Sequence, residues 1–441
     1  MSAQAQCPPR PNVRPDPMFA QAQVADGAYS AAMETEIRNQ TVYSSGYDPI
    51  SRPAEVTHVK IGLNVLAIDE LDIKGQKLSV AGWLTLEWQD DRLQWNKTEK
   101  NDIEYMFTKP KDIWKPELIV DNSLRDLGAL QGGSLMLRVL HTGHVEWTLP
   151  QILTTSCQVD ITYYPYDEQK CAIEIVSWGF RIDELSLDHL FEEVNLEDFV
   201  QHGEWMIVGT ALEDMNLTEH LPDGSVVIYP QVDFWLHLRR RTQFYNLNVM
   251  MPVILTSILA TLVFMVPVES GEKVSFVLTV FLSLAVLLTI VSDSLPPTSI
   301  TVSVLGVYLG VVMVMAAFGV FLTVLILLIH HRPGNPGSSC VLVKITRICA
   351  RVLCMEFPRG DEQEDAQSNM VSPLKDTKEA NGGSRVNITQ TRETSQISSI
   401  DVEVTWVRMA EILDRTIFIL FLTLTLLINI IFVAVLAYSS G

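Results

Sequence analysis

The stretch GEKVSFVLTVFLSLAVLLTIVSDSLPPTS, residues 271–299, decides the fold of this chain. It has no charge between Val274 and Val291, so as a helix it would cross a hydrocarbon layer of about 30 Å. At about 100° per residue, one face carries Glu272, Ser275, Thr279, Leu282, Val286 and Asp293. Acidic ends, hydroxyls and an apolar middle indicate a pore-lining helix. In the alternative, Ser275 and Thr279 bond to a neighbouring helix and Glu272 only favours the helix N-terminus.

Charge is unevenly distributed along the 441 residues, which carry a formal net charge of -20 and a mean hydropathy of +0.20. Apolar runs cover residues 247–266, 274–291, 303–329 and 417–436, and each is long enough to span a membrane. The loop after the third run contains Lys344, Arg347 and Arg351, so the positive-inside rule places this loop in the cytoplasm. We expect a multi-pass plasma-membrane protein that contacts lipid and has both termini outside the cell.

Two features disagree with this orientation. Arg239, Arg240 and Arg241 precede the first span on the outer side. A large outer domain is translocated regardless of charge, but these arginines then need an acidic partner. Residues 1–14 do not resemble a signal peptide, so we expect a mature or engineered form of the chain, or the opposite orientation.

The residues before the first span alternate between apolar and polar in short segments. These segments are residues 56–68, 78–89, 134–149, 172–178 and 226–241, and turn signals separate them. The pattern predicts an antiparallel β-sandwich of roughly 200 residues with most tryptophans in its core. N-x-S/T sequons begin at Asn39, Asn96 and Asn216, which would accept sugars if this domain is extracellular.

The predicted architecture is therefore an extracellular antiparallel β-sandwich plus a four-helix transmembrane bundle. Its parts are a flexible N-terminal extension (1–34), the sandwich (35–243), three membrane helices (244–331, pore-lining 272–293), a cytoplasmic loop (332–411) and the fourth membrane helix with an outer C-terminus (412–441). Residues 338–357 fit a basic amphipathic helix on the inner leaflet. Residues 402–413 resume helical periodicity that can continue into the fourth span.

Cysteine placement agrees with this division. Cys157 and Cys171 lie in the predicted outer domain, and a disulfide between them would close a ring worth about 3 kcal/mol. Cys340, Cys349 and Cys354 lie in the cytoplasmic loop and should stay reduced, with palmitoylation an option near the membrane. Cys7 has no assigned role.

The segment CQVDITYYPYDEQKC, residues 157–171, resembles the Cys-loop of pentameric ligand-gated ion channels. Other motifs of that family follow in its order: WLTLEW (83–88), WKPE (114–117), SW (177–178), GEW (203–205), RRR (239–241), SGEK (270–273) and PPTS (296–299). The resemblance runs from about residue 35 to the C-terminus, is weakest in the cytoplasmic loop, and is closest to nicotinic acetylcholine receptor subunits. It implies four further subunits, in a homo- or heteropentamer, a small-molecule agonist and conduction of monovalent cations.

The resemblance also implies a ligand site between neighbouring subunits. Trp178 and Tyr229 match its principal side and Trp83 its adjoining side, where aromatic rings attract an ammonium group. Sandwich core is the alternative for each ring. Asp121 stands where the family usually has a tyrosine, and residues 211–228 lack the adjacent cysteines of acetylcholine-binding subunits. Asp121 would either strengthen a cation site or serve a different ligand.

Coupling and selectivity follow from the same resemblance. We expect Asp167 to pair with Arg241, and Pro296 and Pro297 to receive motion above the pore; in the alternative, the pair is a surface contact of little energetic value. Five copies of Glu272 at the cytoplasmic mouth, with Asp293 near the outer mouth, would favour cations. Leu282 would form the main hydrophobic constriction and Val286 a second ring.

The predicted function is a subunit of a pentameric, extracellular-ligand-gated, cation-selective ion channel. The missing cysteine pair favours one alternative, an accessory subunit that conducts only with principal partners. A second alternative, a non-conducting glycosylated receptor or scaffold, is disfavoured by the intact polar stripe. The sequence has no nucleophile–base pair, metal-ligand spacing or phosphate loop. We therefore expect no enzyme activity, cofactor, metal site or nucleic-acid partner.

Overall fold

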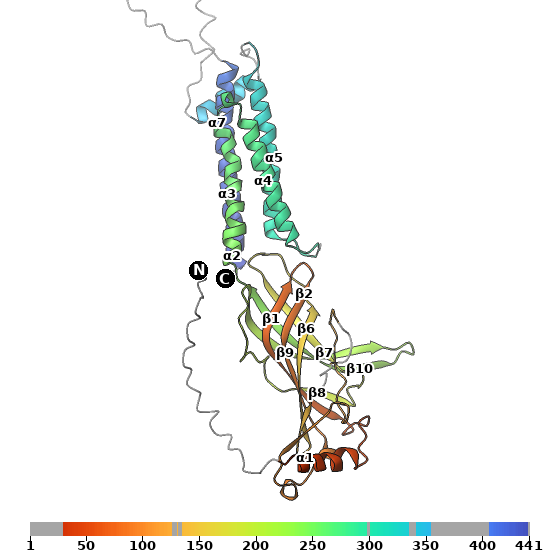
Figure 1. The fold of residues 1–441 in the computed structure, drawn as a ribbon. Helices are drawn as coiled ribbons and strands as arrows, with labels where there is room; N and C mark the ends of the chain where they lie inside the picture. Colours follow the sequence, from red (N-terminus) through yellow and green to blue (C-terminus); the bar gives the residue numbers. More distant parts are fainter. Residues whose placement is uncertain are drawn as a thin grey trace, which may run out of the picture.

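The computed structural model describes residues 30–125, 130, 135–297, 300–334, 341–353 and 405–439. A β-sandwich forms one end of the molecule, and an elongated bundle of long helices forms the other (Figure 1). Helix α1 (Ala31–Arg38) packs at the end of the sandwich away from the bundle (Figure 1). This helix begins inside the region predicted as a flexible extension, because the Ser30 side chain caps it and Ile37 is fully buried.

The sandwich consists of two sheets. In spatial order, the first contains β3 (Tyr105–Thr108), β5 (Leu137–Leu140), β6 (His144–Ser156), β2 (Lys77–Gln89), β1 (Thr57–Asp72) and β8 (Leu185–His189). The second contains β4 (Ile119–Val120), β7 (Glu168–Val176), β10 (Val226–Arg240) and β9 (Trp205–His220). Among the described strand pairs only β1 and β8 run parallel, so the predicted antiparallel sandwich is confirmed with that one exception.

Strand β10 illustrates how the sequence pattern specifies the sheet. Val232, Phe234, Leu236 and Leu238 are each at most 1% exposed and face the opposite sheet. Burying side chains of this size contributes about 1.5–3 kcal/mol each. Because successive residues of a strand face opposite sides, the same period buries Arg240 at the strand's end.

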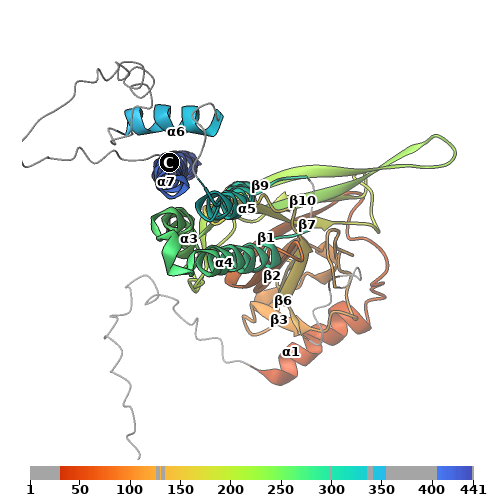
Figure 2. The same ribbon diagram turned by 90° about the horizontal axis from the view of Figure 1, so that it is seen from above.

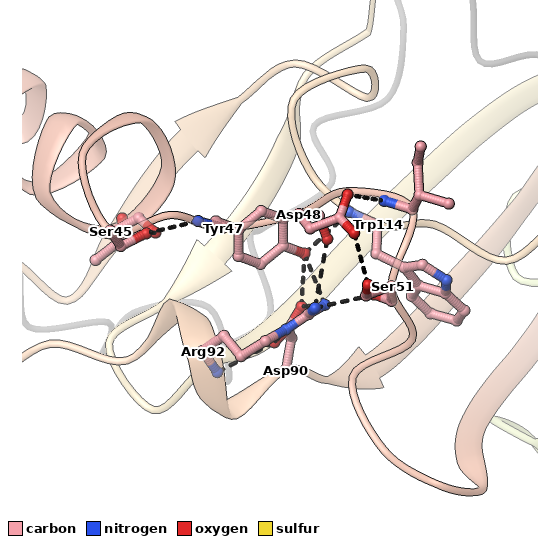
Figure 3. A network of polar contacts seen from close by, with 9 residues as sticks. Ser45, Tyr47, Asp48, Ser51, Asp90, Arg92 and Trp114 are labelled. Atoms are coloured by element: carbon pink, nitrogen blue, oxygen red, sulfur yellow. Dashed lines mark hydrogen bonds and ion pairs between the residues drawn. The ribbon is translucent and has the colours of Figure 1, made fainter.

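A polar network fixes the chain after α1 to the first sheet (Figure 3). Asp90 is fully buried and accepts hydrogen bonds from the Tyr47 hydroxyl at 2.7 Å and from Arg92 Nε at 2.9 Å. The Tyr47 hydroxyl in turn accepts from the Trp114 backbone amide at 3.0 Å. Burial raises the pKa of Tyr47, so it remains a neutral donor. The network satisfies a buried carboxylate that would otherwise destabilise the fold.

Four helical segments are long and apolar enough to span a membrane: Gln243–Met265, Lys273–Asp293, Val304–His330 and Trp406–Tyr438. The first contains α2 (Gln243–Tyr245), a π-helical turn (Asn246–Met250) and α3 (Met251–Thr261), with Pro252 as the second residue of α3, directly after the π-helical turn. The others are α4 (Lys273–Asp293), α5 (Val304–His330) and α7 (Trp406–Ser439). Helix α7 is continuous from Trp406, so the last span begins earlier than the predicted residue 412.

The helices form a four-membered bundle in which α3 and α5 separate α4 from most of α7 (Figure 2). Helix α6 (Val341–Val352) lies across the end of the bundle away from the sandwich (Figures 1 and 2). Its Val343 packs with Trp406 and Met409 of α7, so the structure contains the predicted amphipathic helix. Cys349 on α6 is a free thiol. Cys7, Cys340 and Cys354 lie outside the described residues.

Candidate functional site

Helix α4 has two faces with different partners. Lys273, Val277, Val280, Leu284 and Val291 are buried within the bundle. The predicted pore residues all lie on the opposite, exposed face: Glu272, Ser275, Thr279, Leu282, Val286 and Asp293. Leu282, near the middle of the helix, is 64% exposed. The face that carries the polar stripe therefore has no partner among the described residues of this chain.

The hydroxyls of this face are bonded within α4 itself. Thr279 donates to the Ser275 carbonyl at 2.8 Å, and Ser283 donates to the Thr279 carbonyl at 2.9 Å. Because each hydroxyl acts as the donor, both lone pairs of its oxygen remain available as acceptors. Among the described residues, Thr279 therefore donates within α4 and not to another helix.

The sandwich and the bundle meet at a buried arginine. Arg240 Nε donates to Asp167 Oδ1 at 2.8 Å, and its NH2 group donates to Asp167 Oδ2 at 3.1 Å. A second carboxylate, Glu204, also pairs with Arg240 and accepts from the Tyr245 hydroxyl at 2.8 Å. Only 2% of the Arg240 side chain and 1% of the Asp167 side chain are exposed. This geometry is the bidentate pairing for which arginine is suited.

The expected pair between Asp167 and Arg241 is wrong. Arg241 is exposed and donates to Gln201 Oε1 at 3.2 Å. Strand alternation explains the correction, because Arg240 continues the inward-facing row of β10 and its two neighbours point outward. Arg239 pairs at the surface with Glu168 at 2.5 Å. The alternation of apolar residues from 232 to 238 was the sequence signal that identifies Arg240.

Aromatic rings complete the environment of Arg240. Its guanidinium carbon lies 4.2 Å from the Trp205 ring centroid and 5.2 Å from those of Tyr164 and Tyr245. Burial lowers the pKa of the guanidinium, but the hydrogen bonds and charge of Asp167 outweigh this effect and the pKa lies above its ordinary value. The charge of Arg240 is therefore permanent. Sequence reasoning did not connect Glu204, Trp205 and Tyr245 with Arg240, because residues 204–205 and residue 245 lie in segments separated along the chain.

The loop closed by the disulfide Cys157–Cys171 contacts the helices directly. Tyr166 donates to Asn246 Oδ1 at the start of the first span, and the Val304 amide of α5 donates to the Thr162 carbonyl at 2.9 Å. Leu295, after the end of α4, packs against the cores of both the sandwich and the bundle. Of the two predicted coupling prolines, Pro296 is buried and Pro297 is exposed.

Three of the predicted ligand residues lie on neighbouring strands of the second sheet. Asp121 follows β4, and its amide donates to the Glu174 carbonyl of β7 at 2.9 Å. Trp178 follows β7, and the amide of the preceding Ser177 donates to Pro230, next to Tyr229, at 3.2 Å. The Tyr229 hydroxyl donates to Glu219 Oε2 at 3.2 Å.

The remaining aromatic residue lies apart from these three. Trp83 belongs to β2 of the first sheet, where it pairs with Asn64 and Pro150. Trp178 is 60% exposed, in contrast to Trp88, Trp114, Trp147 and Trp205, which are at most 2% exposed. A core role is therefore wrong for Trp178. The structure places Asp121, Trp178 and Tyr229 on or next to adjacent strands of the second sheet and Trp83 on the first sheet.

A row of carboxylates crosses the second sheet beside these residues. Glu174 on β7 is directly opposite Asp233 on β10, and Asp233 is directly opposite Glu213 on β9. Burial raises the pKa of Glu174, and the charges of Asp233 and Asp121 raise it further. Burial also raises the pKa of Asp233. Among the described residues, only the side-chain amides of Asn122 and Gln231 donate hydrogen bonds to these two carboxylates.

This row predicts a pH dependence of stability. Because the fold favours the protonated forms of Glu174 and Asp233, the free energy of unfolding should increase as pH falls from 7 toward their raised pKa values and decrease as pH rises through them. A Glu174→Gln variant should be more stable at pH 7 by about 0.2–1 kcal/mol, since it removes a like-charge cross-strand pair. Thermal unfolding at pH 5 and pH 7 measures both effects. Glu168→Gln is the matched control on the same strand, and it should not stabilise because Glu168 faces Arg239.

Comparison with known proteins now identifies the family. A model of the neurotransmitter-gated ion-channel ligand binding domain matches residues 34–242, and one of the neurotransmitter-gated ion-channel transmembrane region matches residues 249–396. The chain belongs to the neurotransmitter-gated ion-channel family. This family consists of channels, which agrees with the expectation that the chain is not an enzyme.

Individual relatives of this channel-family chain are neuronal acetylcholine receptor subunits. The alpha-2 subunit of Gallus gallus is 32% identical over 292 residues, which cover 65% of this chain and 54% of the relative. The human alpha-2 subunit is 31% identical over 328 residues (74% and 61%), and the human alpha-4 subunit is 31% identical over 320 residues (71% and 50%). The matched part of the chain thus spans about half to three-fifths of the length of these curated relatives. The predicted resemblance to nicotinic receptor subunits is confirmed.

Family membership and the four apolar helices together make the chain a multi-pass membrane protein. The disulfide Cys157–Cys171, at the position expected for a Cys-loop, is confirmed. The side chains of Asn39, Asn96 and Asn216 are exposed, so each is accessible for glycosylation. Asn96 already accepts from the Thr98 amide at 3.2 Å in a local turn.

Proposed function

We propose that this chain is a subunit of a pentameric, cation-selective channel that an extracellular small molecule opens. The observation that carries the proposal is the unpartnered polar stripe on α4, from Glu272 to Asp293, opposite the buried face of the same helix. In a ring of five copies, this face of each α4 would contact the neighbouring α4 helices and the water of a central pore. Thr279 and Ser275 would then avoid the cost of facing lipid. The plasma membrane, with both termini outside, is the proposed location.

The proposed agonist site combines Trp178, Tyr229 and Asp121 of one subunit with Trp83 of its neighbour. Trp83 lies on the other sheet, as expected for a residue that serves a different subunit interface. The nearby carboxylates Glu174, Asp233 and Glu213 make the region negative, which favours an organic cation over an anion or a neutral molecule. Cation–π attraction would contribute about 0.5–2 kcal/mol for each well-placed ring.

An accessory subunit that conducts only beside principal partners is the second candidate. The hairpin between β9 and β10, which extends away from the sandwich, supports it (Figures 1 and 2). Its strands pair up to His220 and Val226 and have no cysteine pair at the tip. Expression of the chain alone and with a principal neuronal alpha subunit, under a panel of organic cations, separates the candidates. Current from the chain alone supports a channel that this chain forms by itself. Current only on co-expression supports an accessory subunit. The absence of current in both cases supports a non-conducting receptor.

The charged mouth of the proposed pore gives a quantitative test. A Glu272→Gln variant should lose cation conductance, and Glu272→Lys should shift the reversal potential toward that of chloride, because the ring charge sets the local ion concentration. Reversal potentials under a sodium chloride gradient measure this. Glu411→Gln, at the same end of the bundle but on α7, is the matched control and should leave the reversal potential unchanged. Chloride permeation through the unmodified channel would contradict the cation assignment.

A further inference from the structure

A cavity opens at the end of the bundle away from the sandwich. It has a volume of about 470 Å³ and lies between the α3–α4 connection, the end of α5 and the start of α7. We call it the linker cavity. Phe264, Met265 and Phe418 form its apolar wall, and Glu269, His330, Glu411, Asp414 and Arg415 contribute its polar groups. A cavity that is apolar on one side and charged on the other suits an amphiphile.

The cavity contains buried polar atoms that the described residues do not satisfy. Asp414 is 7% exposed, and its Oδ2 accepts from Lys273 Nζ at the start of α4. Its other oxygen, Oδ1, is buried and has no hydrogen-bond partner among the described residues. His330 Nδ1 is also buried and has no hydrogen-bond partner among the described residues. A buried acceptor left unsatisfied costs about 1–3 kcal/mol, so a ligand that donates a hydrogen bond to Asp414 Oδ1 would be stabilised there.

The position of the cavity limits where that donor comes from. The charges of α7 end at Arg415, and residues 417–436 are apolar, so the cavity lies where the span enters the water interface. Molecules that present a polar head and an apolar tail at this depth are membrane lipids. The tail would contact Phe264 and Phe418, and the head would reach Asp414.

We propose that the linker cavity binds the headgroup of a phospholipid with a primary ammonium group, of the phosphatidylethanolamine type. A primary ammonium offers N–H donors to Asp414 Oδ1, with Glu411 one turn earlier on α7 adding attraction. His330, which also lines the cavity, would bind the phosphate. A quaternary choline headgroup has no N–H and leaves Oδ1 unpaired. The extra carboxylate of a serine headgroup would meet Glu269 and Glu411, so ethanolamine is the preferred form.

This site would connect lipid composition to the base of α4. Lys273 is 1% exposed, and among the described residues its ammonium group donates a hydrogen bond only to Asp414. It immediately follows Glu272 of the proposed cytoplasmic mouth. A lipid that occupies Asp414 therefore acts one residue away from the ring that faces the pore axis. The binding proposal itself does not depend on conduction.

Lipid photolabelling of the purified full-length protein tests the proposal. The probes are a phosphatidylethanolamine with a diazirine in its acyl chain and its mono-, di- and trimethylated nitrogen analogues. We expect labelled peptides from residues 264–269 and 411–418, with competition by unlabelled lipid falling about tenfold or more from the primary to the quaternary headgroup. Equal competition by ethanolamine and choline lipids, or labelling only elsewhere, would overturn the proposal.

Variants distinguish this cavity from general lipid contact. Phe418→Trp reduces the cavity without removing a charge, and it should abolish labelling of residues 411–418. The matched control is Leu255→Trp, which fills the separate outer cavity between α3 and α7 and should leave labelling at the linker cavity unchanged. Asp414→Asn should remove the preference for the primary ammonium; if that variant does not fold, the headgroup series on the unmodified protein still decides the result. Intact labelling of Phe418→Trp would contradict the proposed site.

Discussion

An Arg240→Gln variant is expected to lose nearly all folded protein at the cell surface. The substitution leaves the buried carboxylate of Asp167 without its cation. Removing one partner of a buried ion pair costs about 3–5 kcal/mol, a large part of the roughly 5–15 kcal/mol that keeps a typical domain folded. Surface biotinylation, together with thermal unfolding of the detergent-solubilised protein, measures the loss.

The neighbouring arginines provide the controls for this prediction. Arg239→Gln and Arg241→Gln change exposed side chains and should alter stability by no more than about 0.5 kcal/mol. An Asp167→Asn, Arg240→Gln double variant should be less damaged than the sum of the single changes, because it leaves no unpaired charge. Additive losses, or an equal loss in Arg241→Gln, would contradict the pairing described for Arg240.

A Leu282→Thr variant is expected to open without ligand or at a ligand concentration at least about tenfold lower. Leu282 is 64% exposed on the polar face of α4, where a ring of five leucines would close the pore by excluding water. Threonine is easier to hydrate, so it lowers the cost of the open state. A total change of about 1.4 kcal/mol over the assembly is enough for a tenfold shift. Leak current and concentration–response curves measure it.

The control for this prediction is the same substitution at a leucine of equal exposure on another helix. Leu420→Thr changes a residue that is 61% exposed on α7, on the other side of α3 and α5 from α4. It should leave the concentration–response curve unchanged. A shift of the same size in both variants would show that the effect of Leu282→Thr arises from general destabilisation rather than from the pore.

The sequence alone predicts which side chains are exposed or buried where a single periodicity determines it. The exposure of the six predicted pore residues on one side of α4 follows from a 3.6-residue period, and the inward row of β10 follows from a period of two. The error at Arg241 arose because that second period was not extended to the end of the strand, although Leu236 and Leu238 already defined it. Applied through Arg240, the same reasoning would have chosen the correct arginine.

Features built from distant segments were not predictable in this way. Glu204 and Asp167 are 37 positions apart, and they meet at Arg240 only after β7, β9 and β10 have paired. Asp414 and Lys273 are further apart still, and only helix packing brings them together. The carboxylate row of Glu174 and Asp233 depends on the register between β7 and β10. No local pattern reports such register, so only the folded chain reveals these sites.

The packing of Leu295 against two cores has a practical consequence for anyone who truncates the chain. Tyr164 is 4% exposed only because it packs with helices such as α3 and α5, and Leu295 covers the sandwich from beyond α4. A secreted fragment ending at residue 241 would lack the helices, so it would expose the rings of Tyr164 and Tyr166 to solvent and self-associate. A soluble version for crystallisation therefore requires hydrophilic replacements at Tyr164 and Tyr166 before any change to the ligand-facing end.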